Sequence, residues 1–163
     1  MPEWIDIILY AHVIGATVLF GTGMGIAFFM VIANRSKSPT IIAHVAGTVV
    51  IADTIFTATA AIIQPITGAI LASHSGWPLT QGWVFLSLLL YIFVGIFWLP
   101  VVYIQIKMKN IAIKAASENL DLGVAYQKLY RIWFAFGFPA FFAVLLIFWL
   151  MLFKPDINLG LGI

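Results

Sequence analysis

Long stretches without a charged side chain dominate this sequence and decide what it can fold into. Residues 7–34, 82–106 and 132–153 contain no charged residue, and residues 40–63 contain only Asp53. About 20 apolar residues in an α-helix cross the hydrocarbon core of a bilayer. Hydrophobic residues make up 63% of the chain and charged residues 9%, whereas a soluble domain has roughly 25% charged residues. We therefore expect an all-α polytopic membrane protein that uses lipid as its main solvent.

The stretches predict four transmembrane helices in one domain that covers residues 1–163. Polar and helix-breaking residues set the expected bounds, which are about 5–34, 40–64, 82–107 and 131–153. Gln64 and Pro65 are expected to end the second helix, because proline lacks a backbone N–H. Residues 64–83 then read as a connection at the membrane surface, and residues 107–131 as a helical hairpin outside the bilayer. The acidic start of the chain is unlike a cleavable signal peptide, so the first helix is expected to be retained.

The basic residues predict the orientation. Seven of the eight lie in the first and third connections or beside them: Arg35, Lys37, Lys107, Lys109, Lys114, Lys128 and Arg131. Lys and Arg concentrate on the cytoplasmic side of membrane proteins. We expect a bacterial inner membrane protein with both termini outside.

His12 is the first candidate for chemistry, because ionisable side chains within a membrane are costly and often functional. At 100° per residue, Gly15, Ala16 and Gly23 share its side of the first helix. These small residues could leave room for a flat macrocycle such as haem, with His12 as the axial ligand. The alternative is that His12 donates a hydrogen bond to a carbonyl or hydroxyl of a neighbouring helix. Thr17, Gly21 and Gly25 lie on the opposite face as a small-residue stripe suited to close helix packing.

Two further histidines and one aspartate complete the candidates. His44 is placed near the inner end of the second helix, too far in depth to share one haem with His12. His74 is placed in the outer connection, where it could be a second haem ligand or simply an exposed side chain. Asp53 is expected near the bilayer midplane as a proton relay, a cation ligand, a partner of His12, or a protonated carboxyl bonded to threonine hydroxyls.

The opening helix, from Ile8 through His12 to Gly25, resembles that of a bacterial family of uncharacterised integral membrane proteins, DUF2269, and the resemblance covers nearly the whole chain. More distantly, the layout is similar to HemJ-type protoporphyrinogen oxidases and copper-resistance D-like membrane proteins. That similarity implies b-type haem at His12. The chain carries Ser87 where those oxidases have a lysine, so the resemblance extends to a haem pocket rather than to their reaction.

Three functions follow as hypotheses. The first is a haem-b-binding protein that transfers electrons or handles a tetrapyrrole, with His12, Gly15, Ala16, Gly23, His74 and Asp53 around the cofactor. The second is a cofactor-free subunit that packs, as a homo-oligomer or in a larger membrane complex, through its glycine stripe. The third is a small transporter or metal-handling protein that uses Asp53 and His44. No phosphate loop, nucleophile motif or nucleic-acid-binding motif is present, so ATPase, hydrolase and nucleic-acid-binding roles have no basis in the sequence.

Overall fold

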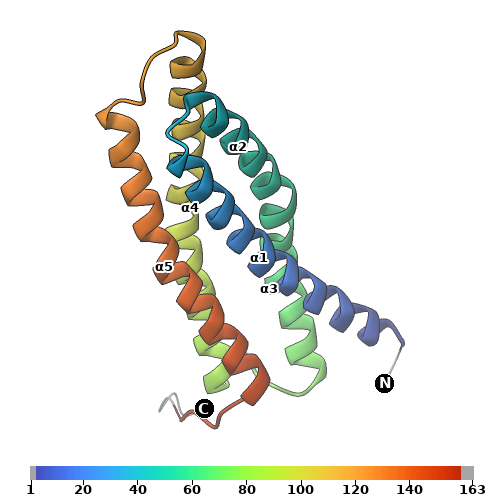
Figure 1. The fold of residues 1–163 in the computed structure, drawn as a ribbon. Coiled ribbons are helices and arrows are strands. Elements are labelled where there is room, and N and C mark those ends of the chain that lie inside the picture. The colour runs from blue at the N-terminus through green and yellow to red at the C-terminus, as the bar shows by residue number, and fades with distance from the viewer. Residues whose placement is uncertain (1–2, 159–163) are drawn as a thin grey trace.

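The computed structural model describes residues 3–158 and contains α-helices and one π-helical turn. The elements are α1 (Glu3–Arg35), α2 (Pro39–Ala52), the π-helical turn η1 (Asp53–Thr57), α3 (Ala58–His74), α4 (Gly82–Ser117) and α5 (Val124–Phe153). No break separates α2, η1 and α3, so these three elements form one continuous rod. The described chain is therefore a bundle of four rods (Figure 1).

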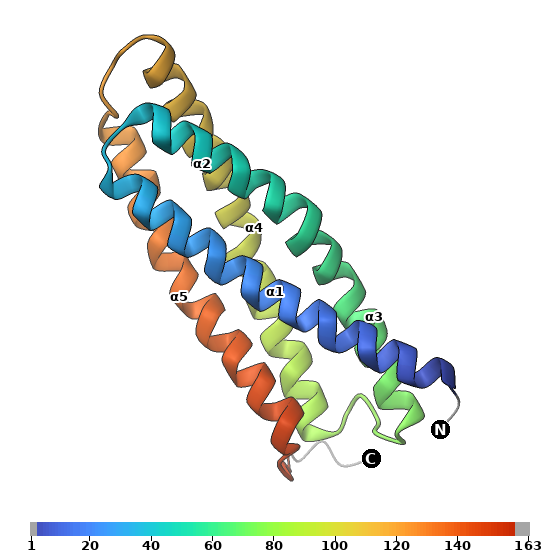
Figure 2. The same ribbon diagram turned by 45° about the vertical axis from the view of Figure 1, so that its right-hand side comes forward.

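Each of the four rods is long and apolar enough to cross a membrane. The rods run up and down side by side, as both ribbon views show (Figures 1 and 2). The connections 36–38 and 118–123 lie at one end, which we call the basic end because seven basic residues fall in or near it. The connection 75–81 and both limits of the described chain lie at the other, which we call the terminal end. The prediction of a four-helix membrane bundle is confirmed.

Local sequence explains where the rods begin and end. Ser38 caps α2, since its side chain accepts a hydrogen bond from the Ile41 N–H, and Pro39 occupies the first helical turn, where proline is favoured. Lys154 ends α5 in a left-handed conformation with φ 43°. The helical hairpin expected over residues 107–131 corresponds to the ends of α4 and α5, which are joined by residues 118–123.

The expectation that the second helix ends at Gln64 is wrong. The helix continues through Pro65 to His74. Proline cannot donate to the carbonyl four residues earlier, which is that of Ala61. The hydroxyl of Tyr91 on α4 donates to this carbonyl instead. A side chain from another rod therefore replaces the missing backbone bond, as membrane helices with internal proline require.

Two separate hydrophobic clusters hold the rods together. The larger lies in the half of the bundle toward the basic end and draws on all four rods: Ile26, Met30, Ala33, Ile42, Ala46, Val49, Ile104, Met108, Ala112, Tyr126 and Trp133. The smaller lies toward the terminal end and joins only α4 and α5, through Trp83, Val84 and Leu150. Between them, Phe20 of α1 stacks against Phe141 of α5 with ring centroids 5.6 Å apart. The rods consequently pack most closely toward the basic end, and Figures 1 and 2 show α1 and α3 diverging from α5 toward the terminal end.

The π-helical turn separates two parts of one rod that pack differently. Before it, Ile42 and Val49 belong to the larger cluster together with residues of α4 and α5. After it, Gln64 and Thr67 are buried and contact α1. Within it, the Ala58 N–H bonds to the Asp53 carbonyl, five residues earlier, so one extra residue is accommodated in the helix. The turn therefore lies where the rod, which packs on α4 and α1 before it, comes to pack mainly on α1.

Candidate functional site

Asp53 opens the π-helical turn near the middle of its rod and is buried, with 4% of its surface exposed. The indole Nε1 of Trp98 on α4 donates to its Oδ1 at 3.2 Å. The Thr57 side chain, four residues later, is also buried, and its hydroxyl lies beside the carboxyl without a well-formed hydrogen bond. A carboxyl group is thus enclosed by protein well inside a rod that is long and apolar enough to span a membrane, and ionisable side chains in such segments are costly and often functional.

Gln105 on α4 connects this carboxyl to α5. Only 1% of its surface is exposed, and its amide lies between two groups. One end of the amide is 3.3 Å from Asp53 Oδ2 and the other is 3.3 Å from the indole Nε1 of Trp133. With its NH₂ toward Asp53, Gln105 donates to the carboxyl and accepts from Trp133, which satisfies both neighbours. We call Asp53, Trp98, Gln105 and Trp133 the midplane network, after the depth that the sequence predicts for Asp53.

The midplane network has no basic partner. Among residues 3–158 the one ion pair is between Lys114 and Glu118, on the surface near the basic end. Asp53 instead accepts from two neutral donors, the Trp98 indole and the Gln105 amide, and Gln105 in turn accepts from the Trp133 indole. A carboxyl held by neutral groups can exist in both protonation states without breaking an ion pair. This arrangement suits the binding and release of a proton.

His12 lies in a second polar contact, between α1 and α3. Its Nδ1 is 2.8 Å from the Thr67 hydroxyl, and the Gln64 amide donates to the His12 backbone carbonyl at 2.7 Å. The Thr67 oxygen also lies 2.9 Å from the Ile63 carbonyl. A hydroxyl has one proton, so when Thr67 donates it to Ile63, His12 must carry its proton on Nδ1 and donate to Thr67. The expected alternative, a hydrogen bond from His12 to a hydroxyl of a neighbouring helix, describes this contact.

The surroundings of His12 do not fit a haem between α1 and α3. A Cβ atom at Gly15 would lie 3.0 Å from the Gln64 Nε2, and one at Gly68 would lie 3.2 Å from the His12 Cε1. The space that Gly15 was expected to leave for a ring is therefore filled by the Gln64 side chain. Gly23 has no neighbour within 4 Å of such an atom and is exposed, and Ala16 is half-buried. The small residues therefore do not enclose one pocket for a flat ring.

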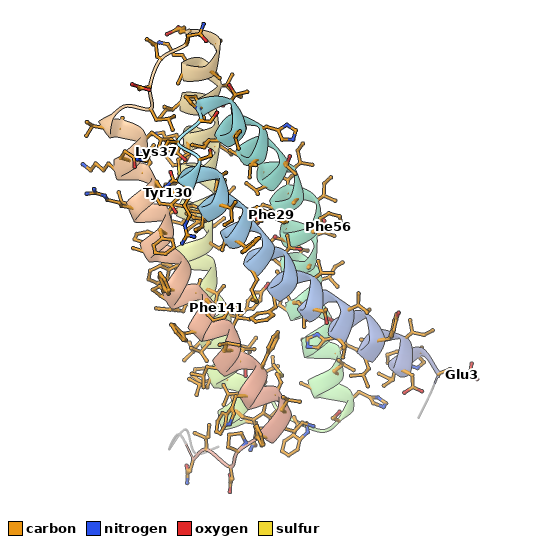
Figure 3. All side chains as sticks on the ribbon, viewed as in Figure 1. Glu3, Phe29, Lys37, Phe56, Tyr130 and Phe141 are labelled. Atoms are coloured by element: carbon orange, nitrogen blue, oxygen red, sulfur yellow. The ribbon has the colours of Figure 1, made fainter. Side chains whose placement is uncertain are left out.

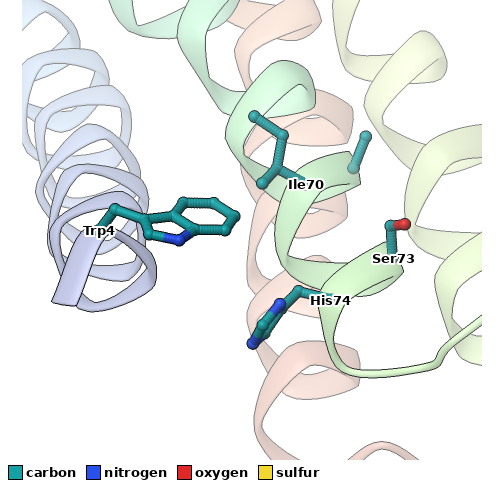
Figure 4. A pocket seen from close by; sticks show the side chains of 5 residues that line it. Trp4, Ile70, Ser73 and His74 are labelled. Carbon is teal, nitrogen blue, oxygen red and sulfur yellow. The ribbon is translucent and has the colours of Figure 1, made fainter. Parts of the chain in front are cut away.

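The other sequence candidates lie apart from His12. His74 ends α3 and is exposed, with its ring 5.8 Å from that of Trp4. These two side chains border an open hollow of about 430 Å³ (Figure 4). Seven residues separate His74 from Thr67, or roughly 10 Å along the helix, so His74 does not face His12 across a shared site. His44 is exposed near the basic end. Asp53 bonds to Trp98 rather than to His12.

The sequence pattern did not point to Trp98, Gln105, Trp133 or Tyr91 as site residues. Gln105 could have been identified from the sequence, because it lies just inside the charge-free stretch 82–106 and a buried amide there needs a hydrogen-bond partner. The two tryptophans could not have been identified in this way, since Trp is common near membrane interfaces. Within the described residues, no group of three or more His, Asp or Glu side chains could hold a metal ion.

Comparison with known proteins agrees with the membrane fold. No curated protein and no solved structure matches the chain. The model of the DUF2269 family, described as a predicted integral membrane protein, matches residues 6–155. That range contains all four spans apart from the first residues of α1, and it includes Asp53, Gln105 and His12. The chain therefore belongs to the DUF2269 family of integral membrane proteins.

Proposed function

We propose that this integral membrane protein binds and releases a proton at Asp53 and that this exchange is the basis of its activity. The observation that carries the proposal is the buried carboxyl of Asp53 at the middle of a membrane rod, held by neutral donors alone. An unpaired ionised carboxylate in an apolar interior is costly, and the cost falls when the group takes up a proton. Proton binding is therefore the chemistry that this position favours.

Two features of the surrounding helix support the proposal. The π-helical turn that begins at Asp53 is a rare element, and such turns occur frequently at functional sites. Buried polar side chains then occur along the same rod toward the terminal end: Asp53, Thr57, Gln64 and Thr67, with His12 bonded to the last. They extend over about 21 Å of helix, from Asp53 beside α4 to Thr67 beside α1. We propose that these polar side chains mark the route of a proton between Asp53 and the terminal end.

Infrared difference spectroscopy tests proton binding directly. The purified protein in lipid nanodiscs is stepped between acidic and alkaline buffer, and the C=O band of a protonated carboxylic acid is recorded. The Asp53→Asn variant should lose one such band. Thr54→Ala is the matched control, because Thr54 is exposed on the neighbouring position and its hydroxyl bonds only to the Val50 carbonyl. A spectrum that is the same for wild type and Asp53→Asn would refute the proposal.

Proton movement across the membrane is the functional test. The protein is reconstituted into vesicles that contain a pH-sensitive dye, and a potential is applied with a potassium ionophore. We expect proton flux above that of protein-free vesicles for wild type and Thr54→Ala, and a loss of that flux for Asp53→Asn. We also propose that the basic end faces the cytoplasm of a bacterial inner membrane, in agreement with the distribution of Lys and Arg.

A second candidate function is that of a subunit in a homo-oligomer or larger membrane complex. It is favoured by the stripe of Thr17, Gly21 and Gly25, because no atom lies within 4 Å of a Cβ placed at either glycine. Close helix contacts in membranes use such small residues. Gly21→Leu should reduce oligomer or partner recovery in mild detergent, whereas Gly137→Leu, at an exposed glycine of α5 that is likewise open, should not. Equal recovery from both variants would argue against this candidate.

A further inference from the structure

Gln105 lies between two groups whose hydrogen-bonding requirements differ. The indole of Trp133 can only donate, so it needs the oxygen of the amide. An ionised Asp53 can only accept, so it needs the NH₂ of the amide. A protonated Asp53 can donate through Oδ2 and then needs the amide oxygen for itself. The distances of 3.3 Å on both sides of the Gln105 amide are the same for either orientation of the amide.

We infer that the Gln105 amide turns over when Asp53 takes up a proton, and that this turn breaks its hydrogen bond to Trp133. The inference rests on the proposed function only in requiring that Asp53 changes its protonation state. With the carboxyl ionised, the chain of bonds runs from Trp133 to the Gln105 oxygen and from the Gln105 nitrogen to Asp53. With the carboxyl protonated, its O–H donates to the Gln105 oxygen, and the Gln105 nitrogen faces the Trp133 indole, donor against donor. Gln105 thereby acts as a positioning residue that links Asp53 to α5.

Loss of the hydrogen bond between Gln105 and Trp133 would change side-chain packing toward the basic end. The ring of Trp133 stacks on Tyr130 with centroids 5.9 Å apart, and Tyr130 stacks on Tyr126 at 6.5 Å. Tyr126 is fully buried in the larger hydrophobic cluster. Figure 3 shows Tyr130 near the basic end, in the part of the bundle where Lys37 also lies. A proton taken up by Asp53 can thus alter the packing of α5 as far as Tyr126, about two helical turns from Trp133.

No other titratable group contacts the midplane network directly by a hydrogen bond in the described chain. The surrounding elements carry eight uncharged titratable side chains: Tyr10 and His12 on α1, His44 on α2, His74 on α3, Tyr91 and Tyr103 on α4, and Tyr126 and Tyr130 on α5. His12 bonds to Thr67 and Tyr91 to the Ala61 carbonyl. The charged side chains of the same elements lie nearer the ends: Glu3, Asp6, Arg35, Lys107, Lys109, Lys114, Lys128 and Arg131. A pH-dependent change shared by Trp98 and Trp133 is therefore attributable to Asp53.

Nuclear magnetic resonance of the tryptophan indoles tests the inference independently of flux. The protein is labelled with ¹⁵N-tryptophan, and Trp98→Phe and Trp133→Phe variants assign the two resonances. In wild type, both indole resonances should shift with pH at the same midpoint, because Trp98 bonds Asp53 directly and Trp133 does so through Gln105. In Asp53→Asn, neither should shift. The side-chain NH₂ that this substitution introduces donates to the Gln105 oxygen as a protonated carboxyl does, so Trp133 should stay at its acidic position.

The Gln105→Met variant distinguishes the turn of the amide from proton binding at Asp53. In this variant Trp98 should still shift with pH, and Trp133 should become insensitive to it. If Gln105→Met does not fold, the two resonances of the wild-type protein still test the inference. A Trp98 resonance that shifts while Trp133 does not would overturn the inference and leave proton binding at Asp53 intact. If neither resonance shifts and the infrared band is absent, the proposed function fails and the inference fails with it.

Discussion

Removal of the Tyr91 hydroxyl should destabilise the bundle only as long as residue 65 is proline. Tyr91 donates to the Ala61 carbonyl, which has no backbone partner because Pro65 has no N–H. Tyr91→Phe leaves this half-buried carbonyl unpaired. Pro65→Ala supplies the N–H that an ordinary helix would have, so the carbonyl then pairs within its own rod and the hydroxyl becomes dispensable.

The expected magnitude follows from the location of the bond. Leaving a buried acceptor unpaired costs about 1–3 kcal/mol in soluble proteins, and hydrogen bonds between membrane helices average roughly 0.6 kcal/mol with a maximum near 1.7. We therefore expect Tyr91→Phe to lower the free energy of unfolding by about 1 kcal/mol. In the Pro65→Ala background the same change should cost close to nothing, so the coupling energy is also about 1 kcal/mol.

The assay is a double-mutant cycle of four proteins, unfolded in mixed micelles of lipid, mild detergent and increasing dodecyl sulfate. Far-ultraviolet circular dichroism and tryptophan fluorescence report unfolding. Tyr103→Phe is the control, because Tyr103 is exposed on the same helix and its loss should change little. If Tyr91→Phe costs the same with proline or alanine at position 65, the hydroxyl does not compensate for the missing N–H and the reasoning is refuted.

Three further predictions follow from other parts of the bundle. Gly15→Ala should lower the free energy of unfolding by about 1 kcal/mol, because its methyl group would displace the Gln64 amide from the His12 carbonyl. Gly21→Ala, in open space, should leave the free energy of unfolding unchanged or raise it by up to about 1 kcal/mol. Denaturation of both variants measures the difference, and equal effects would contradict the packing of α1 on α3. The purified protein should show no haem Soret band that depends on His12, and a band abolished by His12→Ala would restore the haem hypothesis. Because the chain has no cysteine, Ser75→Cys should react with an impermeant thiol reagent from outside the cell and Ser117→Cys only after lysis, and the reverse pattern would overturn the proposed orientation.

The spans were predictable because their signal is local. A charge-free stretch of the right length is sufficient to define a membrane helix, and the basic residues mark one end of the bundle. The end of the second helix was not predictable by the same logic. Pro65 does interrupt a backbone bond, but Tyr91, which compensates for it, is distant in the sequence and belongs to another rod.

The candidate site was predictable only in part, because its pairs depend on packing. Asp53 stood out as a lone charge, and His12 stood out as a histidine within an apolar stretch. Helical periodicity placed Gly15 on the side of His12, but it could not show that the Gln64 side chain fills the space beside that glycine. Nor could it pair Asp53 with Trp98 and Gln105, because the π-helical turn changes the direction in which the rod packs.

The extra residue at Asp53–Thr57 also limits how this family can vary in length. Residues in an α-helix follow one another at about 100°, so the loss of a single residue from the turn would rotate everything beyond it by roughly that angle. Gln64 and Thr67 would then leave α1, and apolar neighbours would take their place against His12. A one-residue deletion here would thus disturb the half of the rod toward the terminal end while the packing of α2 on α4 stayed unchanged. We expect relatives to keep the length of this turn even where its side chains differ.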